Sequence, residues 1–134
     1  MRIFLLLGIF ALSLALLPCP SVSEPRIGEA APEFTALTYE GEEVSLAQFA
    51  DRVVVLEWFN RGCPFVVKHY EGAAMQEMQK EYAGKGVVWL TVNSTNPKHR
   101  DFLTSKQAEQ VKKSWKISDA KMIFDKDGRL GQLY

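Results

Sequence analysis

Three short apolar runs divide the chain, and each is followed by a polar turn. Residues 53–59 begin with four consecutive apolar, mostly β-branched side chains, residues 87–92 form a second run, and residues 121–124 form a shorter third one. Continuous runs of this length are typical of parallel strands that are covered on both faces of a sheet. The pattern therefore predicts three strands, and the first of them is expected to be a central one.

Apolar positions at helical spacing follow the first two runs. Pro64 is favoured in the first turn of a helix, and the spacing predicts one helix from there to Tyr82, ended by the Gly-Lys-Gly of residues 84–86. A second helix is expected over residues 105–115, where apolar side chains share one stripe. Each predicted helix thus links two predicted strands.

Polar turns also frame the two ends of this alternating unit. Residues 34–38 and 44–46 read as a β-hairpin around the turn at residues 39–42. Residues 125–128 read as another turn, and a further strand is expected from Arg129 onward. Strands that alternate with helices form right-handed βαβ units. The predicted fold class is therefore α/β, with a mostly parallel sheet.

The first 23 residues have the layout of a secretory signal peptide. Arg2 supplies a positive start, residues 3–17 are almost continuously apolar, and a Ser-Val-Ser tripeptide closes the segment. The apolar stretch is shorter than the roughly 20 residues that span a bilayer. Cleavage and export to the periplasm or the medium are therefore expected, leaving residues 24–134. Retention as a membrane anchor, or lipid attachment at Cys19, are the alternatives.

Composition narrows the function classes. The chain has 134 residues with 16 basic and 16 acidic side chains, so it is expected to be one domain and not a strongly basic nucleic-acid binder. Its 47% hydrophobic content excludes a disordered chain. Two cysteines cannot build a disulfide scaffold, and the two histidines lack the spacing of metal ligands. Neither a metal nor a bound organic cofactor is implied.

Cys63 is the candidate reactive group. It starts a predicted helix directly after a strand, where unpaired amides and the positive helix end stabilise a thiolate over a thiol. Asn60, Arg61, Pro64 and Phe65 form its expected surroundings: Arg61 adds positive charge, and Phe65 shapes access. Without Cys19 an exported chain cannot close an internal disulfide, which indicates intermolecular pairing or reactivity. The alternative is an inert, small hydrophobic residue.

Other titratable side chains are weaker candidates than this thiol. Glu57 lies in the first apolar run, where burial would raise its pKa and suit it to proton transfer. The alternative is a side chain that reaches solvent at the strand end. His69 faces away from the thiol at 100° per helical residue, and His99 lies in a loop. Residues 93–95 fit an N-glycosylation sequon, which matters only in a eukaryotic secretory pathway.

Residues 53–70, VVVLEWFNRGCPFVVKHY, resemble the active-site strand, turn and helix of the thioredoxin-like superfamily. The likeness is greatest to its redoxin branch, which includes alkyl hydroperoxide reductase/thiol-specific antioxidant (AhpC/TSA) proteins. Residues 31–34 (APEF), Gly41 and residues 45–46 resemble the N-terminal hairpin of that branch. The resemblance covers residues 26–134 and implies a thioredoxin-like fold with this hairpin.

The family normally continues beyond the point where this sequence stops. Asp127 and Gly128 match a family turn that leads to a cis-Pro loop, a closing strand and a final helix, but no proline follows Pro97. Residues 24–134 are therefore expected to be a thioredoxin-like domain that lacks those parts, as a fragment or truncated product. A sheet completed by a partner is the alternative.

The resemblance also implies the chemistry. Cys63 matches the attacking cysteine of the family's CxxC motif, and Val66 occupies the place of the second cysteine. Peroxiredoxins place Thr or Ser three residues before the reactive cysteine and Pro seven before, where this chain has Asn60 and Leu56. A single-thiol oxidoreductase is implied, which attacks a protein disulfide or a peroxide and is released by an external thiol or reductase. A one-cysteine peroxidase and a non-catalytic binding module are the alternatives.

Overall fold

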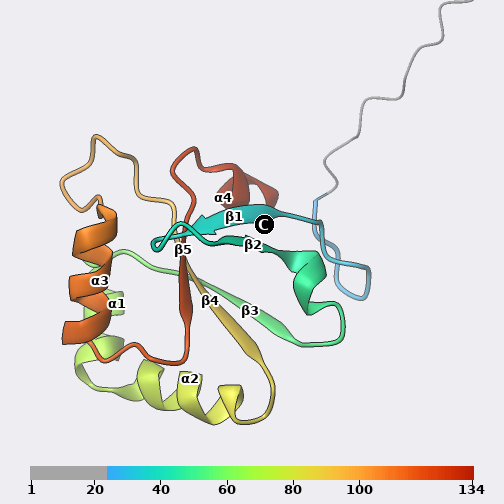
Figure 1. Ribbon diagram of the computed structural model, residues 1–134, viewed down its shortest axis with the longest axis horizontal. Helices are drawn as coiled ribbons and strands as arrows, with labels where there is room; N and C mark the ends of the chain where they lie inside the picture. The colour runs from blue at the N-terminus through green and yellow to red at the C-terminus, as the bar shows by residue number, and fades with distance from the viewer. Residues whose placement is uncertain (1–23) are drawn as a thin grey trace, which may run out of the picture.

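The computed structural model describes residues 24–134 (Figure 1), so the predicted signal peptide and Cys19 lie outside the described residues. Its strands form one five-stranded sheet in the order β2-β1-β5-β4-β3. The elements in chain order are β1 (Thr35–Thr38), β2 (Glu43–Ser45), the 3-10 helix η1 (Leu46–Phe49), β3 (Val54–Trp58), α1 (Pro64–Glu71), α2 (Ala74–Ala83), β4 (Val88–Asn93), α3 (Ser105–Ser114), β5 (Lys121–Phe124) and α4 (Arg129–Leu133).

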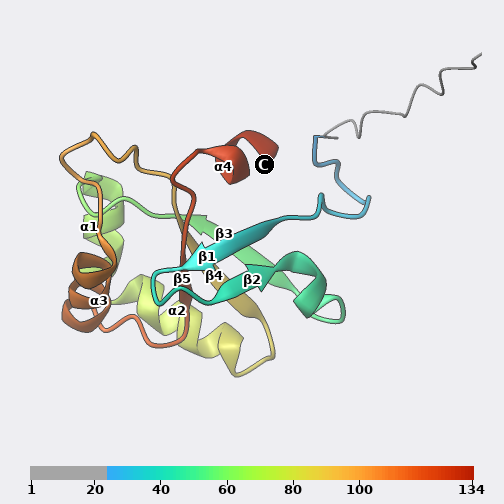
Figure 2. The ribbon, with the colours of Figure 1, turned by 45° about the horizontal axis from the view of Figure 1, so that its top comes forward.

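The sheet is mixed. β3, β4 and β5 are parallel to one another, whereas β1 runs antiparallel to both β2 and β5. Core contacts place α1, α2 and α3 on one face of the sheet and η1 and α4 on the other. Figure 2 shows α4 apart from the other three helices. The α/β class and the thioredoxin-like architecture predicted from the sequence are confirmed.

β4, and not β3, is the central parallel strand. Every residue of β4 is buried, because β3 and β5 pair with it on its two sides. β3 pairs only with β4 in the described sheet, and its residues are half-buried or exposed. The prediction of a central strand at residues 53–59 is therefore wrong for these residues: an apolar run shows that a strand is covered, but not how many neighbours it has.

The helix predicted from Pro64 to Tyr82 is two helices. Gly72 weakens the helix, because glycine has a high conformational entropy, and Ala73 adopts a left-handed conformation with φ 60°. The break itself is exposed, and it is stabilised by the half-buried Gln76, whose Nε2 donates to the carbonyl oxygens of Tyr70 at 2.8 Å and Trp115 at 2.6 Å. The apolar spacing continued across the break and did not reveal it.

The segment after Gly128 is a short helix and not the predicted strand. The carboxylate of Asp125 accepts hydrogen bonds from the backbone amides of Leu130 and Gly131, both at 2.9 Å. These amides lie in the first turn of α4, where a helix leaves its N–H groups without backbone partners. Gly128 supplies the left-handed turn, with φ 73°, that leads into the helix. A carboxylate five residues upstream thus favours the helix.

Candidate functional site

Cys63 lies where the chain passes from β3 into α1. It is the N-cap residue of α1, with extended φ and ψ of −77° and 120°, and its side chain is half-buried. Its backbone N–H donates to the carbonyl of Asn60 at 3.0 Å, and its carbonyl accepts from Val67 at 2.9 Å. The predicted position of Cys63 at the start of a helix is confirmed, and the thiol is accessible at the end of a covered strand.

The turn that carries Cys63 is fixed by Asn60. Its Oδ1 accepts a hydrogen bond from the Gly62 amide at 2.7 Å, and its Nδ2 donates to Oγ1 of Thr95 at 3.3 Å. Both ends of the side-chain amide are therefore occupied. The first contact shapes the turn, and the second ties it to the loop after β4.

Asp101 reaches the same turn from the loop between β4 and α3. Its carboxylate lies so close to Gly62 that a Cβ at position 62 would be 2.2 Å from Oδ2 and 2.7 Å from Oδ1. Any side chain at position 62 would therefore have to displace this carboxylate. His99 lies in the same loop, with Nδ1 3.7 Å from Oδ2 of Asp101. Sequence reasoning did not find Asp101, because only tertiary folding brings this loop onto the turn.

A pocket of about 260 Å³ opens beside Cys63. Apolar surface and a few polar groups share its wall, which is the usual composition of a binding site. Its lining includes Trp58, Asn60, Cys63, Val66, Ser94 and Thr95. Ser94 and Thr95 were not predicted as site residues, and their only signal in the sequence was their place directly after a buried strand.

The other predicted neighbours of the thiol lie outside this pocket. Phe65 is 75% exposed, Pro64 is also exposed, and Arg61 is half-buried. None of the three lines the pocket. His69 and Lys68 are exposed on α1. Phe65 therefore forms an apolar surface next to Cys63 but not the wall of its pocket.

Glu57 faces the core between β3 and the helices. Its carboxylate accepts hydrogen bonds from the Tyr70 hydroxyl at 2.8 Å, Gln79 Nε2 at 3.1 Å and Trp89 Nε1 at 2.7 Å. Burial raises the pKa of Glu57, and these donors only partly oppose the shift. The alternative that Glu57 reaches solvent at the strand end is wrong, because its oxygens are held by α1, α2 and β4. Glu57 is not among the pocket-lining residues.

The family model of AhpC/TSA proteins matches residues 27–134. The chain belongs to the AhpC/TSA family. No curated protein matches the sequence of this family member. Its match begins just before the hairpin and runs through the thiol turn to the last residue, so Cys63 lies within the family domain.

Solved structures share the fold of this AhpC/TSA chain. A hypothetical protein from Sinorhizobium meliloti 1021 is 22% identical with a TM-score of 0.71, over 84% of this chain and 60% of that one. The exposed lipoprotein thioredoxin of Streptococcus pneumoniae is 22% identical with a TM-score of 0.58, over 76% and 72%. A secreted Mycobacterium tuberculosis disulfide oxidoreductase is 17% identical with a TM-score of 0.59, over 75% and 66%. The chain thus spans less than two thirds of the first of these structures.

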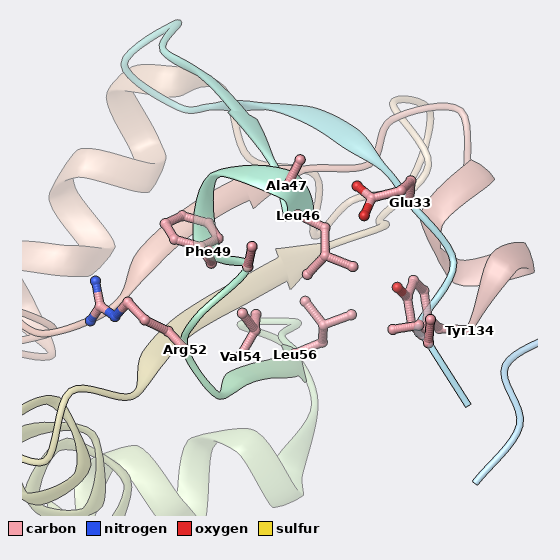
Figure 3. A pocket seen from close by; sticks show the side chains of 11 residues that line it. Glu33, Leu46, Ala47, Phe49, Arg52, Val54, Leu56 and Tyr134 are labelled. Atoms are coloured by element: carbon pink, nitrogen blue, oxygen red, sulfur yellow. The ribbon is translucent and has the colours of Figure 1, made fainter. Parts of the chain in front are cut away.

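A larger hollow of about 410 Å³ lies on the opposite face of the sheet in this AhpC/TSA domain. Figure 3 shows Leu46 of η1, Val54 and Leu56 of β3, and Tyr134 around it. No cysteine or histidine lines it. Because residues alternate between the faces of a strand, Val54 and Leu56 point away from Glu57 and the helices around it. The hollow therefore lacks the nucleophile that the smaller pocket contains.

Two further expectations for this AhpC/TSA chain concern metals and glycosylation. Among residues 24–134, no group of three or more His, Cys, Asp or Glu side chains is placed to hold a metal ion. Asn93 of the sequon is only 2% exposed, and its Oδ1 accepts a hydrogen bond from the Thr95 amide at 3.1 Å. A glycosylating enzyme cannot reach this side chain in the folded domain.

Over the same residues, the helices are all too short or too polar to cross a bilayer.

Proposed function

We propose that this chain is an exported thiol-based oxidoreductase that uses Cys63 alone in thiol–disulfide exchange. The observation that carries the proposal is the place of Cys63: it caps the N-terminus of α1 and opens onto a pocket in a thioredoxin-like domain. Amides at a helix N-terminus favour a thiolate, which is the attacking form. The predicted signal peptide supports export, and two structural neighbours are described as secreted or exposed.

The exchange proceeds in two balanced steps. The Cys63 thiolate forms a bond to one sulfur of a protein disulfide while that disulfide breaks, and its other sulfur leaves as a thiolate. In the second step two external thiols, or the two cysteines of a reductase, act in turn: the first attacks the Cys63 sulfur and releases the reduced substrate, and the second displaces the Cys63 thiolate and leaves the donor as a disulfide. Val66 stands in the place of the second CxxC cysteine, so an intramolecular resolving step at that position is excluded.

Two neighbours of the thiol have proposed roles in this reaction. Asn60 holds the turn through Gly62 and so fixes the backbone that carries the sulfur. Glu57 handles protons behind the thiol site, as its raised pKa suits it to hold a proton at a higher pH than an exposed glutamate does. Glu57 does not line the pocket, so its carboxylate has no direct contact with the pocket wall beside Cys63.

A one-cysteine peroxidase is the second candidate function, and the polar side of the pocket favours it. Asn60 and Thr95 line the pocket beside Cys63, and the second N–H of the Asn60 amide and the hydroxyl hydrogen of Thr95 can donate to a small oxygen compound. In that reaction the thiolate would attack a peroxide oxygen, the O–O bond would break, and Cys63 would become a sulfenic acid while the other oxygen takes a proton and leaves as water or an alcohol.

One experiment separates these functions. The full chain carrying Cys19→Ser is incubated with an oxidised protein substrate or with hydrogen peroxide, and the mass of the Cys63-containing peptide is measured. A mixed disulfide at Cys63 that an added thiol reverses supports the exchange reaction, and Cys63→Ser is the matched control. A sulfenic acid formed with peroxide alone would favour the peroxidase. No adduct from either substrate would contradict both, leaving a non-catalytic binding module.

A further inference from the structure

A chain of hydrogen bonds connects the wall of the Cys63 pocket to a buried carboxylate. Nε1 of Trp58 donates to Oγ of Ser94 at 3.2 Å, and that hydroxyl donates to Oδ2 of Asp125 at 2.7 Å. The three residues come from the ends of β3, β4 and β5, which meet at the carboxyl edge of the parallel strands. None of the reaction steps proposed above uses these hydrogen bonds.

Asp125, the last acceptor in this row of hydrogen bonds, is held firmly in place. It is 4% exposed, and its carboxylate also accepts the amides of Leu130 and Gly131 in α4. α4 packs closely over the three groups: a Cβ at Gly131 would lie 3.5 Å from Asp125 Oδ2, 3.5 Å from Ser94 Oγ and 3.6 Å from Trp58 Nε1. The carboxylate therefore has little freedom to move, and it holds the Ser94 hydroxyl toward the indole.

The indole held in this way belongs to the thiol pocket. Trp58 lines the pocket together with Cys63 and Val66, yet it remains 42% exposed. An aromatic side chain offers a large apolar face, and in Trp58 part of this face is open to contact. The hydrogen bond to Ser94 sets the orientation of that face, and Ser94 itself lines the same pocket.

We propose that Ser94 and Asp125 are positioning residues. They hold the Trp58 indole as the part of the Cys63 pocket wall that determines substrate specificity. An apolar or aromatic group next to the substrate's disulfide packs against this indole. The inference rests on the proposed thiol–disulfide exchange and deepens it by naming the substrate class. An aromatic contact of this kind is expected to change a reaction rate about three- to tenfold.

The test compares three reagents on the full chain carrying Cys19→Ser. Dithiodipyridine is an aromatic disulfide, hydroxyethyl disulfide is an aliphatic one, and iodoacetamide reports access to the thiol. Trp58→Ala is expected to lower the ratio of the aromatic to the aliphatic exchange rate about three- to tenfold, while the iodoacetamide rate stays within about twofold. Ser94→Ala is expected to lower the same ratio, and Ser94→Thr, which keeps the hydroxyl, to restore it.

A second readout separates positioning from general stability. The indole N–H signal of Trp58 in a nuclear magnetic resonance spectrum, identified with Trp58→Phe, is expected to move in Ser94→Ala. Ser114→Ala is the matched control, because that exposed hydroxyl bonds only to a carbonyl within α3. If Trp58→Ala leaves the ratio of aromatic to aliphatic exchange rates unchanged, the role given to Trp58 is overturned, whereas the proposed thiol–disulfide exchange is not. Failure of both disulfides to react, with iodoacetamide still reacting, would overturn the proposed function and this inference with it.

Discussion

At the scale of single residues, the two groups with candidate chemistry have opposite surroundings. Cys63 lies at the surface end of a strand, beside a pocket with polar and apolar walls. Glu57 lies deeper, where three neutral donors surround a carboxylate in a mostly apolar core. Because neutral donors compensate a buried charge only in part, Glu57 makes the stability of the fold depend on pH.

The first prediction concerns this pH dependence. Burial raises the pKa of Glu57 in the folded chain above its unfolded value of 4.5. The folded state therefore binds the proton more tightly, so this contribution to stability is complete below pH 4.5 and is lost as the pH rises through the folded pKa. Urea unfolding at a series of pH values should show this loss in the wild type and not in Glu57→Gln. An equal slope for both proteins would contradict the assignment.

The second prediction concerns Gly62. A side chain at this position forces the Asp101 carboxylate into another rotamer, so Gly62→Ala is expected to lower the free energy of unfolding by about 1 kcal/mol. The double variant Gly62→Ala, Asp101→Ala removes the colliding atoms and is expected to recover part of that loss relative to Asp101→Ala alone. Urea denaturation of the four proteins measures both effects. Effects of Gly62→Ala and Asp101→Ala that are additive in the double variant would show that the loop does not lie on the turn.

At the scale of elements, the sequence predicted covered strands well and helix boundaries less well. β5 has the predicted bounds, Lys121–Phe124, because a short apolar run between polar turns leaves few alternatives. The break between α1 and α2 was missed, since Gln76 stabilises it through contacts with a distant carbonyl. α4 was predicted as a strand, because its capping by Asp125 depends on a turn that sequence spacing does not define.

The third prediction concerns the helix break. Gln76→Ala removes hydrogen bonds to two backbone carbonyls, one at the end of α1 and one after α3, which no water replaces easily in a half-buried position. The expected loss in the free energy of unfolding is about 1–3 kcal/mol. Gln110→Ala, at an exposed position of α3, is the matched control and should change stability by less than about 0.5 kcal/mol. Equal stability of the two variants would refute the role given to Gln76.

At the scale of the whole molecule, the family architecture could be predicted from the sequence. The residues that form the site around Cys63 could be predicted only in part. Cys63 and Asn60 were found because strand, turn and helix are contiguous in sequence. Ser94, Thr95 and Asp101 were not found, because β4 and its following loop meet the thiol turn only after the sheet forms; Asn60 and Thr95 are 35 residues apart. In the register of β3 beside β4, Trp58 lies opposite Val92. This register brings the loop after β4 next to the turn that carries Cys63.

The central claim is that Cys63 is a reactive thiol, and the rate of its alkylation tests this most directly. The full chain carrying Cys19→Ser is treated with iodoacetamide at one neutral pH, once folded and once unfolded in urea. We expect the folded chain to react several-fold faster than the unfolded chain, because amides at a helix N-terminus favour the attacking form of the sulfur. Equal rates, or no reaction while folded, would contradict the account.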